Sequence, residues 1–131
     1  MYESLQHGYM TEEKFVLKCL ENNIQISRTI FNVESYDFVV KTKDGFKSVQ
    51  VKKSWIDERN RNVVNIRCSG RNKNRTYVNP KSADFLAVLI EEGDWFIIPS
   101  TFFEGAVNKL VISKKGKYSS FKDNWEFRTI V

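Results

Sequence analysis

The chain has 131 residues, of which 41% are hydrophobic and 14% aromatic. This is the size and composition of one compact domain with a real core, which excludes wholesale disorder. The net charge of +5 fits a polyanionic partner but does not identify one. No stretch approaches the roughly 20 apolar residues of a membrane span, and the N-terminus lacks the apolar segment of a signal peptide. We therefore expect a soluble, cytoplasmic protein without a membrane partner.

The first predicted element is a helix over residues 11–22. Thr11 can cap its N-terminus, and Asn23 can end it in a left-handed turn. Apolar residues recur at helical spacing and predict the buried stripe: Phe15, Val16, Cys19 and Leu20. The two cysteines, Cys19 and Cys68, form no metal-binding pattern, and we expect both to be buried thiols.

Strands are predicted over the rest of the chain. Their ranges are 24–31, 36–42, 46–55, 62–68, 85–90, 95–98 and 110–113. Asp44 and Gly45 are typical of a tight turn, so the second and third strands should pair as a hairpin. Residues 69–81 are polar and basic and predict a loop, and Pro80 can start a short helix through Asp84. The pattern indicates an α+β (mixed α/β) fold over residues 1–131, with a central mixed sheet flanked by helices.

The hairpin carries the residues of greatest chemical interest. Gln50 and Lys52 are two apart in a strand, so they share one face, and pairing can bring Asp37 close to them. A divalent metal prefers oxygen ligands, which Asp37, the Gln50 side chain and the Val51 backbone carbonyl can supply. Lys52 could orient a water molecule or stabilise charge on a phosphate. Glu12 shares the buried helical stripe, where metal ligation is one reason to find an acid.

Each of these residues also has a simpler interpretation. Gln50 and Lys52 could be the solvated face of an antiparallel hairpin. Asp37 could bind a backbone amide at a strand end, and Glu12 could favour the helix dipole. An acid followed by QxK on a hairpin is a short pattern, so the spacing alone leaves both interpretations open.

A series of segments adds a family resemblance to this pattern. YDFVV, a turn and VQVKKSW resemble the PD-(D/E)XK nuclease superfamily, and within it the group I intron-associated homing endonucleases of bacteria. HGYMTE precedes the helical acid, and CSGRNKNRTY, ADFLAV, WFIIP and KDNWEF follow in the family's order and spacing. The resemblance covers roughly residues 7 to 127.

The resemblance implies a helix–three-strand–helix–strand core and hydrolysis of DNA phosphodiester bonds with Mg²⁺, for which Mn²⁺ would substitute. It assigns the metal-binding acid to Asp37, the glutamine ligand to Gln50 and the catalytic lysine to Lys52. It assigns the helical acid to Glu12, or to Glu13 if the register shifts by one. Tyr36 stands where the superfamily often has Pro, a position that supplies no ligand.

Basic residues surround the predicted fourth strand and the loop after it. Arginine and asparagine side chains bond base edges, and basic side chains bond phosphates, so this segment is the candidate DNA-binding region. Its candidate residues are Arg59, Arg61, Arg71, Lys73, Arg75 and Tyr77. A solvated basic face is the simpler alternative.

The sequence thus predicts a Mg²⁺-dependent, site-specific DNA endonuclease of the intron-homing type, acting on double-stranded or branched DNA. Two alternatives remain: a Holliday-junction resolvase-like nuclease, and a non-catalytic DNA-binding module on the nuclease fold. One active centre cuts one strand, so we expect a homodimer or higher homo-oligomer. Phe102, Phe103 and Trp125 are candidate exposed contacts for it.

Overall fold

A computed structural model describes residues 2–30, 36–66, 83–103 and 109–130 of the chain, with side chains described from Gln6. Its elements, in chain order, are α1 (Tyr2–Glu21), β1 (Ile26–Arg28), β2 (Phe38–Thr42), β3 (Gly45–Lys53), β4 (Trp55–Ile56), β5 (Asn62–Asn65), β6 (Phe85–Leu89), β7 (Trp95–Pro99), the 3₁₀ turn η2 (Ser100–Phe102), β8 (Lys109–Ile112) and the 3₁₀ turn η3 (Ser119–Phe121). The predicted α+β class is confirmed.

The central sheet has five strands in the order β1-β2-β3-β6-β7. β2 and β3 form the predicted antiparallel hairpin, with Gly45 at a φ of +105° beside the turn. β3 and β6 run parallel, whereas the other neighbours are antiparallel, so the sheet is mixed as expected. All residues of β6 and β7 are buried, because both faces of these strands are covered.

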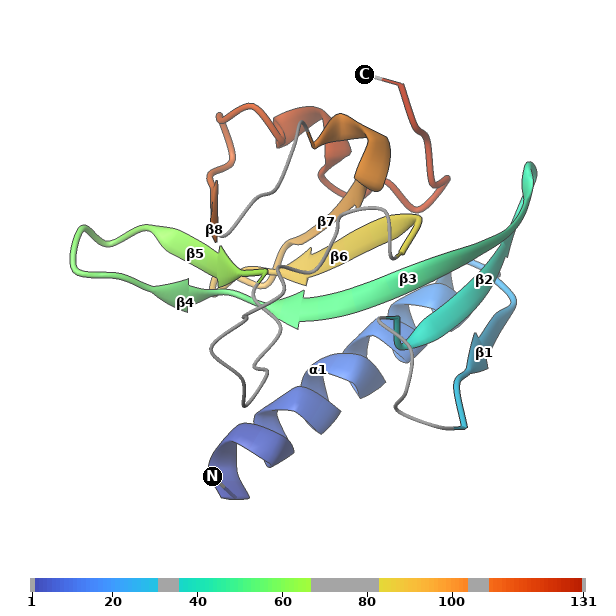
Figure 1. The fold of residues 1–131 in the computed structure, drawn as a ribbon, viewed down its shortest axis with the longest axis horizontal. Coiled ribbons are helices and arrows are strands. Elements are labelled where there is room, and N and C mark those ends of the chain that lie inside the picture. Colours follow the sequence, from blue (N-terminus) through green and yellow to red (C-terminus); the bar gives the residue numbers. More distant parts are fainter. Residues whose placement is uncertain (1, 31–35, 67–82, 104–108, 131) are drawn as a thin grey trace, which may run out of the picture.

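Helix α1 lies along one face of this sheet (Figure 1). Phe15 and Cys19 are completely buried, in one cluster with Phe38, Val49 and Val51 of the hairpin. This confirms the predicted stripe and the buried Cys19 thiol, while Cys68 lies outside the described residues. Leu20 departs from the expectation: its side chain is 60% exposed on the outer side of the helix.

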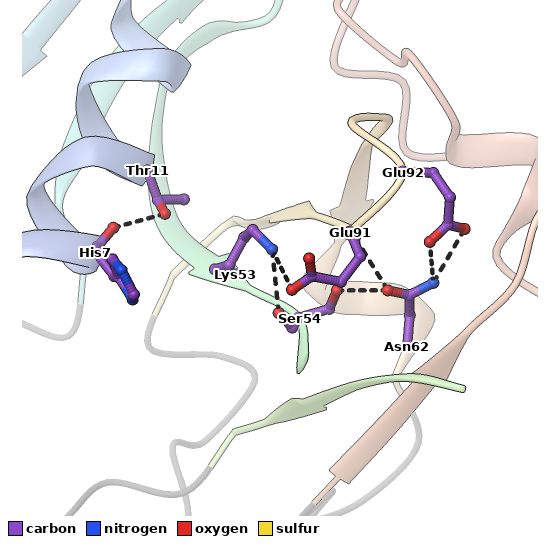
Figure 2. Close-up of polar contacts among 7 residues, drawn as sticks. All are labelled: His7, Thr11, Lys53, Ser54, Asn62, Glu91 and Glu92. Atoms are coloured by element: carbon purple, nitrogen blue, oxygen red, sulfur yellow. Dashed lines mark hydrogen bonds and ion pairs between the residues drawn. The ribbon is translucent and has the colours of Figure 1, made fainter. Parts of the chain in front are cut away.

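The helix begins at Tyr2 rather than at Thr11. Residues 2–10 contain neither proline nor a β-branched side chain, and Gly8 is the one residue among them that disfavours a helix without breaking it. Thr11 is consequently inside the helix and does not cap it: its hydroxyl donates to the His7 carbonyl at 2.8 Å (Figure 2). Asn23, with a φ of 59°, ends the helix as predicted.

A second sheet, in the order β4-β5-β8, lies on the other side of the central sheet. Val64, Leu110 and Ile112 of this sheet form a core cluster with Leu86 and Val88 of β6. In the described part of the chain, therefore, this face is covered by strands and 3₁₀ turns, and α1 is the α-helix that flanks the sheet.

The predicted helix at 80–84 is not present in its described portion. Ala83 and Asp84 are not helical, and residues 80–82 lie outside the described ranges. The Asp84 carboxylate instead accepts hydrogen bonds from the backbone amide and the hydroxyl of Ser48, at 2.9 and 3.2 Å. These bonds align the start of β6 beside β3, because Asp84 precedes β6 directly.

A polar network joins the two sheets where β3 ends (Figure 2). The amide oxygen of Asn62 accepts hydrogen bonds from the Ser54 hydroxyl and the Glu91 backbone amide, at 2.8 and 3.0 Å. The amide nitrogen of Asn62 donates to the Glu92 carboxylate at 2.9 Å. Lys53 pairs with Glu91 at 2.7 Å. Ser54 breaks the predicted strand 46–55 into β3 and β4, and this network fixes the turn between them.

The remaining boundaries are close to the predicted ones. The first strand is shorter than predicted, since β1 holds only Ile26 to Arg28 of the range 24–31, whose last residue is not described. Across the described residues, no helix combines the length and the apolar character that a membrane span requires.

Candidate active site

Asp37 lies directly before β2 and is tied to β3 by its backbone and its side chain. Its backbone amide donates to the Val49 carbonyl at 2.9 Å. Its Oδ2 accepts a hydrogen bond of 2.8 Å from the backbone amide of Val51. Phe38 pairs with Val49, so the same register places Asp37 opposite Gln50. The carboxylate therefore lies at the QVK segment of β3, as the sequence predicted.

Gln50 and Lys52 share a face of β3, opposite to the face that packs on α1. They pair with Leu86 and Val88 of β6, which belong to the cluster of the second sheet. Paired residues of neighbouring strands point to the same side, so Gln50 and Lys52 face that side as well. Both are only partly buried. The positive charge of Lys52 lowers the pKa of Asp37, so the two groups are close enough to interact electrostatically.

Burial is nevertheless the largest influence on Asp37 and raises its pKa above the ordinary value. The Val51 hydrogen bond and Lys52 oppose this rise. Glu12, on the helix, behaves similarly: burial raises its pKa, and the negative charge of Asp37 raises it further. Glu12 and Asp37 thus come from different elements, yet the charge of Asp37 acts on Glu12.

Glu13 points elsewhere. It is exposed, and its carboxylate accepts a hydrogen bond from the guanidinium of Arg28 on β1. Glu12 is therefore the helical acid that accompanies Asp37 in this structure. Our sequence reasoning did not single out Arg28. The order of strands, which places β1 beside β2, cannot be read from the local pattern around that residue.

The oxygen donors of this site fit a divalent cation. Glu12 and Asp37 supply carboxylates, and the Gln50 side chain and the Val51 carbonyl are neutral oxygen donors at the same segment of β3. Burial raises the pKa of both acids, and the charge of Asp37 raises that of Glu12 further, so one bound cation would stabilise both ionised carboxylates. The described residues contain no cluster of three His, Cys, Asp or Glu side chains. Charge neutralisation would therefore depend on the two acids.

Comparisons with known proteins agree with this geometry. The family model described as "PD-(D/E)XK endonuclease" matches residues 2–130. The chain belongs to the PD-(D/E)XK endonuclease family. A solved structure titled as that of a bacterial homing endonuclease, I-Ssp6803I, has the same fold, with a TM-score of 0.76 and 19% sequence identity. The likeness covers 90% of this chain and 87% of that one. A search of curated proteins finds no match.

The predicted DNA-binding residues of this PD-(D/E)XK endonuclease fall into two groups. Arg71, Lys73, Arg75 and Tyr77 lie outside the described residues. Arg59 and Arg61 lie in the β4–β5 hairpin, which Figure 1 shows extending away from the central sheet. Arg61 donates from Nε and Nη2 to the Asp57 carboxylate, at 3.0 and 2.8 Å. Arg59 is exposed, and its backbone amide bonds Asp57 at 3.0 Å.

These contacts give the two arginines of the endonuclease different roles. Arg61 closes the hairpin turn, because one carboxylate holds its side chain and both backbone amides. The Arg61 hydrogen bond is also the main reason for the lowered pKa of Asp57. The Arg59 side chain is exposed near the tip of the hairpin.

The candidate oligomer contacts are not the exposed residues that we expected. Phe102 and Phe103 are partly buried and pack against the core on the second-sheet side. The Phe102 ring lies 4.9 Å from the ring of Phe121. Trp125 packs on Phe15, with ring centroids 5.9 Å apart. Aromatic neighbours that come from distant parts of the sequence partly cover these rings within the endonuclease itself.

Proposed function

We propose that this endonuclease hydrolyses DNA phosphodiester bonds with Mg²⁺ at Glu12, Asp37, Gln50 and Lys52, and that residues 1–131 act as one domain. The observation that carries the proposal is the hydrogen bond between Asp37 and Val51. It holds a partly buried carboxylate against the QVK segment, beside a second acid and a lysine. A solvated hairpin face would not need a buried acid at this position.

Each residue has a task in this proposal. Glu12, Asp37, the Gln50 side chain and the Val51 carbonyl would hold Mg²⁺, with Mn²⁺ as a substitute. A bound Mg²⁺ would polarise the phosphate and lower the pKa of a water molecule. Lys52 would orient the attacking water or stabilise the negative charge that develops on the phosphate. Gln50 carries no charge, so cation binding depends mainly on Asp37 and Glu12.

DNA would be held outside the acid site. Arg59 stands at the tip of the β4–β5 hairpin, which continues the chain directly after Lys52 and Lys53. We place the remaining contacts on Arg71, Lys73, Arg75 and Tyr77. Arg61 would contribute through the shape of the hairpin, since Asp57 holds its side chain. We propose a cytoplasmic location for this activity.

The biological role that we propose is intron homing, with cleavage of a specific duplex site. The fold shared with the bacterial homing endonuclease I-Ssp6803I supports this role. Cutting both strands needs two active centres, so we propose a homodimer or higher homo-oligomer. A Holliday-junction resolvase remains the second candidate, because branched DNA would also need two symmetric centres.

One experiment tests the enzyme and its substrate together. The protein is incubated with Mg²⁺ and either a duplex that contains an intron-insertion site or a four-way junction, beside Asp37→Asn as the matched inactive control. We expect the wild type to cut the duplex and the variant to leave it intact. Cutting of the junction alone would favour resolution. Equal cutting by the wild type and Asp37→Asn would refute the proposed active site.

A further inference from the structure

The edge strand β1 contacts the elements that carry both acids of the site. Arg28 pairs in register with Phe38 of β2, and its guanidinium lies 5.3 Å from the centre of the Phe38 ring. The same guanidinium donates to the Glu13 carboxylate of α1. One side chain therefore fixes α1 relative to the hairpin, at the residue next to Glu12.

The following residue, Thr29, contacts the second acid. Its backbone amide and its hydroxyl both donate to the Asp37 carbonyl, each at 3.3 Å. On the opposite side, the Asp37 amide donates to the Val49 carbonyl of β3. The backbone of Asp37 is thus held from the residue that follows β1 and from β3, in addition to the bond that its side chain makes with Val51.

The helix needs such a contact at this point. Residues 6–10 are exposed, and burial begins at Thr11, so Glu12 lies where α1 enters the core. Phe15 anchors the helix one turn later. Among the described residues, the Glu13–Arg28 pair is the ion pair that joins α1 to the central sheet. Without it, the segment that bears Glu12 would lose its polar attachment to the strand beside Asp37.

We propose that Arg28 and Thr29 are positioning residues, through which β1 holds Glu12 and Asp37 at the separation that a shared divalent cation requires. This inference rests on the proposed function of the site. It assigns no direct contact with DNA to Arg28, because Glu13 and the Phe38 ring already engage its guanidinium.

Metal binding can be measured without cleavage, by calorimetric titration of the DNA-free protein with Mn²⁺ alone. Arg28→Ala should weaken Mn²⁺ binding about fivefold, the scale of one exposed ion pair together with one cation–π contact. Thr29→Val keeps the backbone bond and should weaken binding about twofold, near the lower end for the removal of a single hydrogen bond. In cleavage assays, both variants should need more Mg²⁺ and reach close to the wild-type rate at saturation.

The matched control is Lys18→Ala. It removes another exposed ion pair of α1, Lys18–Glu21 at 3.6 Å, which lies away from the acids. Its Mn²⁺ affinity should equal that of the wild type. An equal loss of affinity in Lys18→Ala and Arg28→Ala would overturn the inference, because it would point to a general effect on the helix.

A double-mutant cycle separates the ion pair from the change in net charge. Glu13→Arg and Arg28→Glu are measured singly and together, because either substitution alone changes the charge that acts on Glu12. We expect the double variant to bind Mn²⁺ more tightly than the sum of the two single effects on binding free energy predicts. The cycle gives this answer even if Arg28→Ala does not fold. Additive effects would overturn the inference. So would an Arg28→Ala protein that loses DNA affinity in Ca²⁺ while it binds Mn²⁺ normally.

The Asp37→Asn variant separates this inference from the proposed function. If Asp37→Asn binds Mn²⁺ as the wild type does, the metal site itself is misplaced and both proposals fall. If Asp37→Asn loses Mn²⁺ binding while Arg28→Ala and Thr29→Val retain it fully, only the positioning role of β1 is refuted.

Discussion

The Oδ2 atom of Asp37 accepts a hydrogen bond of 2.8 Å from the backbone amide of Val51, across the antiparallel hairpin of β2 and β3. This bond places the acid at the strand segment that carries Gln50 and Lys52. It also leaves the carboxylate partly buried, so that desolvation raises its pKa. The same arrangement that would serve cation binding therefore lowers the stability of the metal-free protein.

The first prediction concerns this loss of stability. Because its pKa is raised, folded Asp37 keeps its proton at pH values where the unfolded chain has released it. The stability of the metal-free protein should therefore fall as pH rises from the ordinary pKa of Asp37 through its raised value. Asp37→Asn removes the charge and keeps an oxygen acceptor for Val51. In EDTA at pH 7 it should unfold at a higher temperature, by about 4 °C for each kcal/mol gained in a chain of this size.

Asp57→Asn is the matched control for this measurement. Its hydrogen bond with Arg61 lowers the pKa of Asp57, which is the opposite shift. The ionised carboxylate therefore stabilises the fold above its ordinary pKa, and this stabilisation is lost as pH falls through the lowered value. Asp57→Asn should unfold at a lower temperature at pH 7. If the unfolding temperature of Asp37→Asn falls as well, burial does not destabilise the ionised form of Asp37.

The second prediction concerns Lys52. Lys52→Ala should lower the cleavage rate by at least about 10²-fold, the scale of losing one group that stabilises charge in a transition state. DNA binding in Ca²⁺ should persist, because phosphate contacts elsewhere supply most of the affinity. Lys53→Ala is the neighbouring control, since Lys53 pairs with Glu91. It should keep most of the cleavage activity. Comparable losses in both variants would remove Lys52 from its proposed role.

The third prediction concerns Gln50. Gln50→Glu adds a carboxylate to a site whose two acids already have raised pKa values. The affinity for the cation should therefore increase, while cleavage continues. Gln50→Ala removes the oxygen donor and should be much less active than Gln50→Glu at the same Mg²⁺ concentration. Cleavage over a range of Mg²⁺ concentrations distinguishes the two effects. If Gln50→Ala needs no more Mg²⁺ than the wild type, Gln50 is not a ligand.

The sequence predicted the parts of this site that depend on local periodicity. Alternation along a strand gave the shared face of Gln50 and Lys52, and helical spacing gave the buried positions of Phe15 and Cys19. The start of α1 at Tyr2 was missed, because the threonine at position 11 looks like a cap although the preceding residues are compatible with helix. The contacts of Arg28 and Thr29 could not be predicted, since they depend on the pairing of β1 with β2.

The fourth prediction concerns the junction of the two sheets. Asn62 is buried, and its side chain bonds Ser54, Glu91 and Glu92 (Figure 2). Asn62→Ala would leave several of these groups without a partner, so it should lower the free energy of unfolding by about 1–3 kcal/mol. Urea denaturation measures this change. Asn65→Ala, at an exposed position of the same strand, should be within about 0.5 kcal/mol of the wild type.

The last prediction concerns DNA binding. It compares two variants, in each of which three basic residues are neutralised. Neutralising Arg71, Lys73 and Arg75 together should weaken DNA binding. It should also flatten the dependence of log affinity on log salt by up to about 0.9 for each phosphate group that the variant no longer neutralises. Neutralising Lys114, Lys115 and Lys117 changes the net charge equally, and Lys114 already pairs with Asp94 at 3.3 Å.

The lysine variant should therefore keep a salt slope close to that of the wild type, because a charge that touches no phosphate releases no counterion. Fluorescence anisotropy in Ca²⁺, at several salt concentrations, measures both slopes without cleavage. If one of the first three residues reads bases, preference for the insertion site over unrelated DNA should decrease as well. Equal slopes for the two triple variants would mean that net charge alone attracts DNA, and the interface would then lie elsewhere.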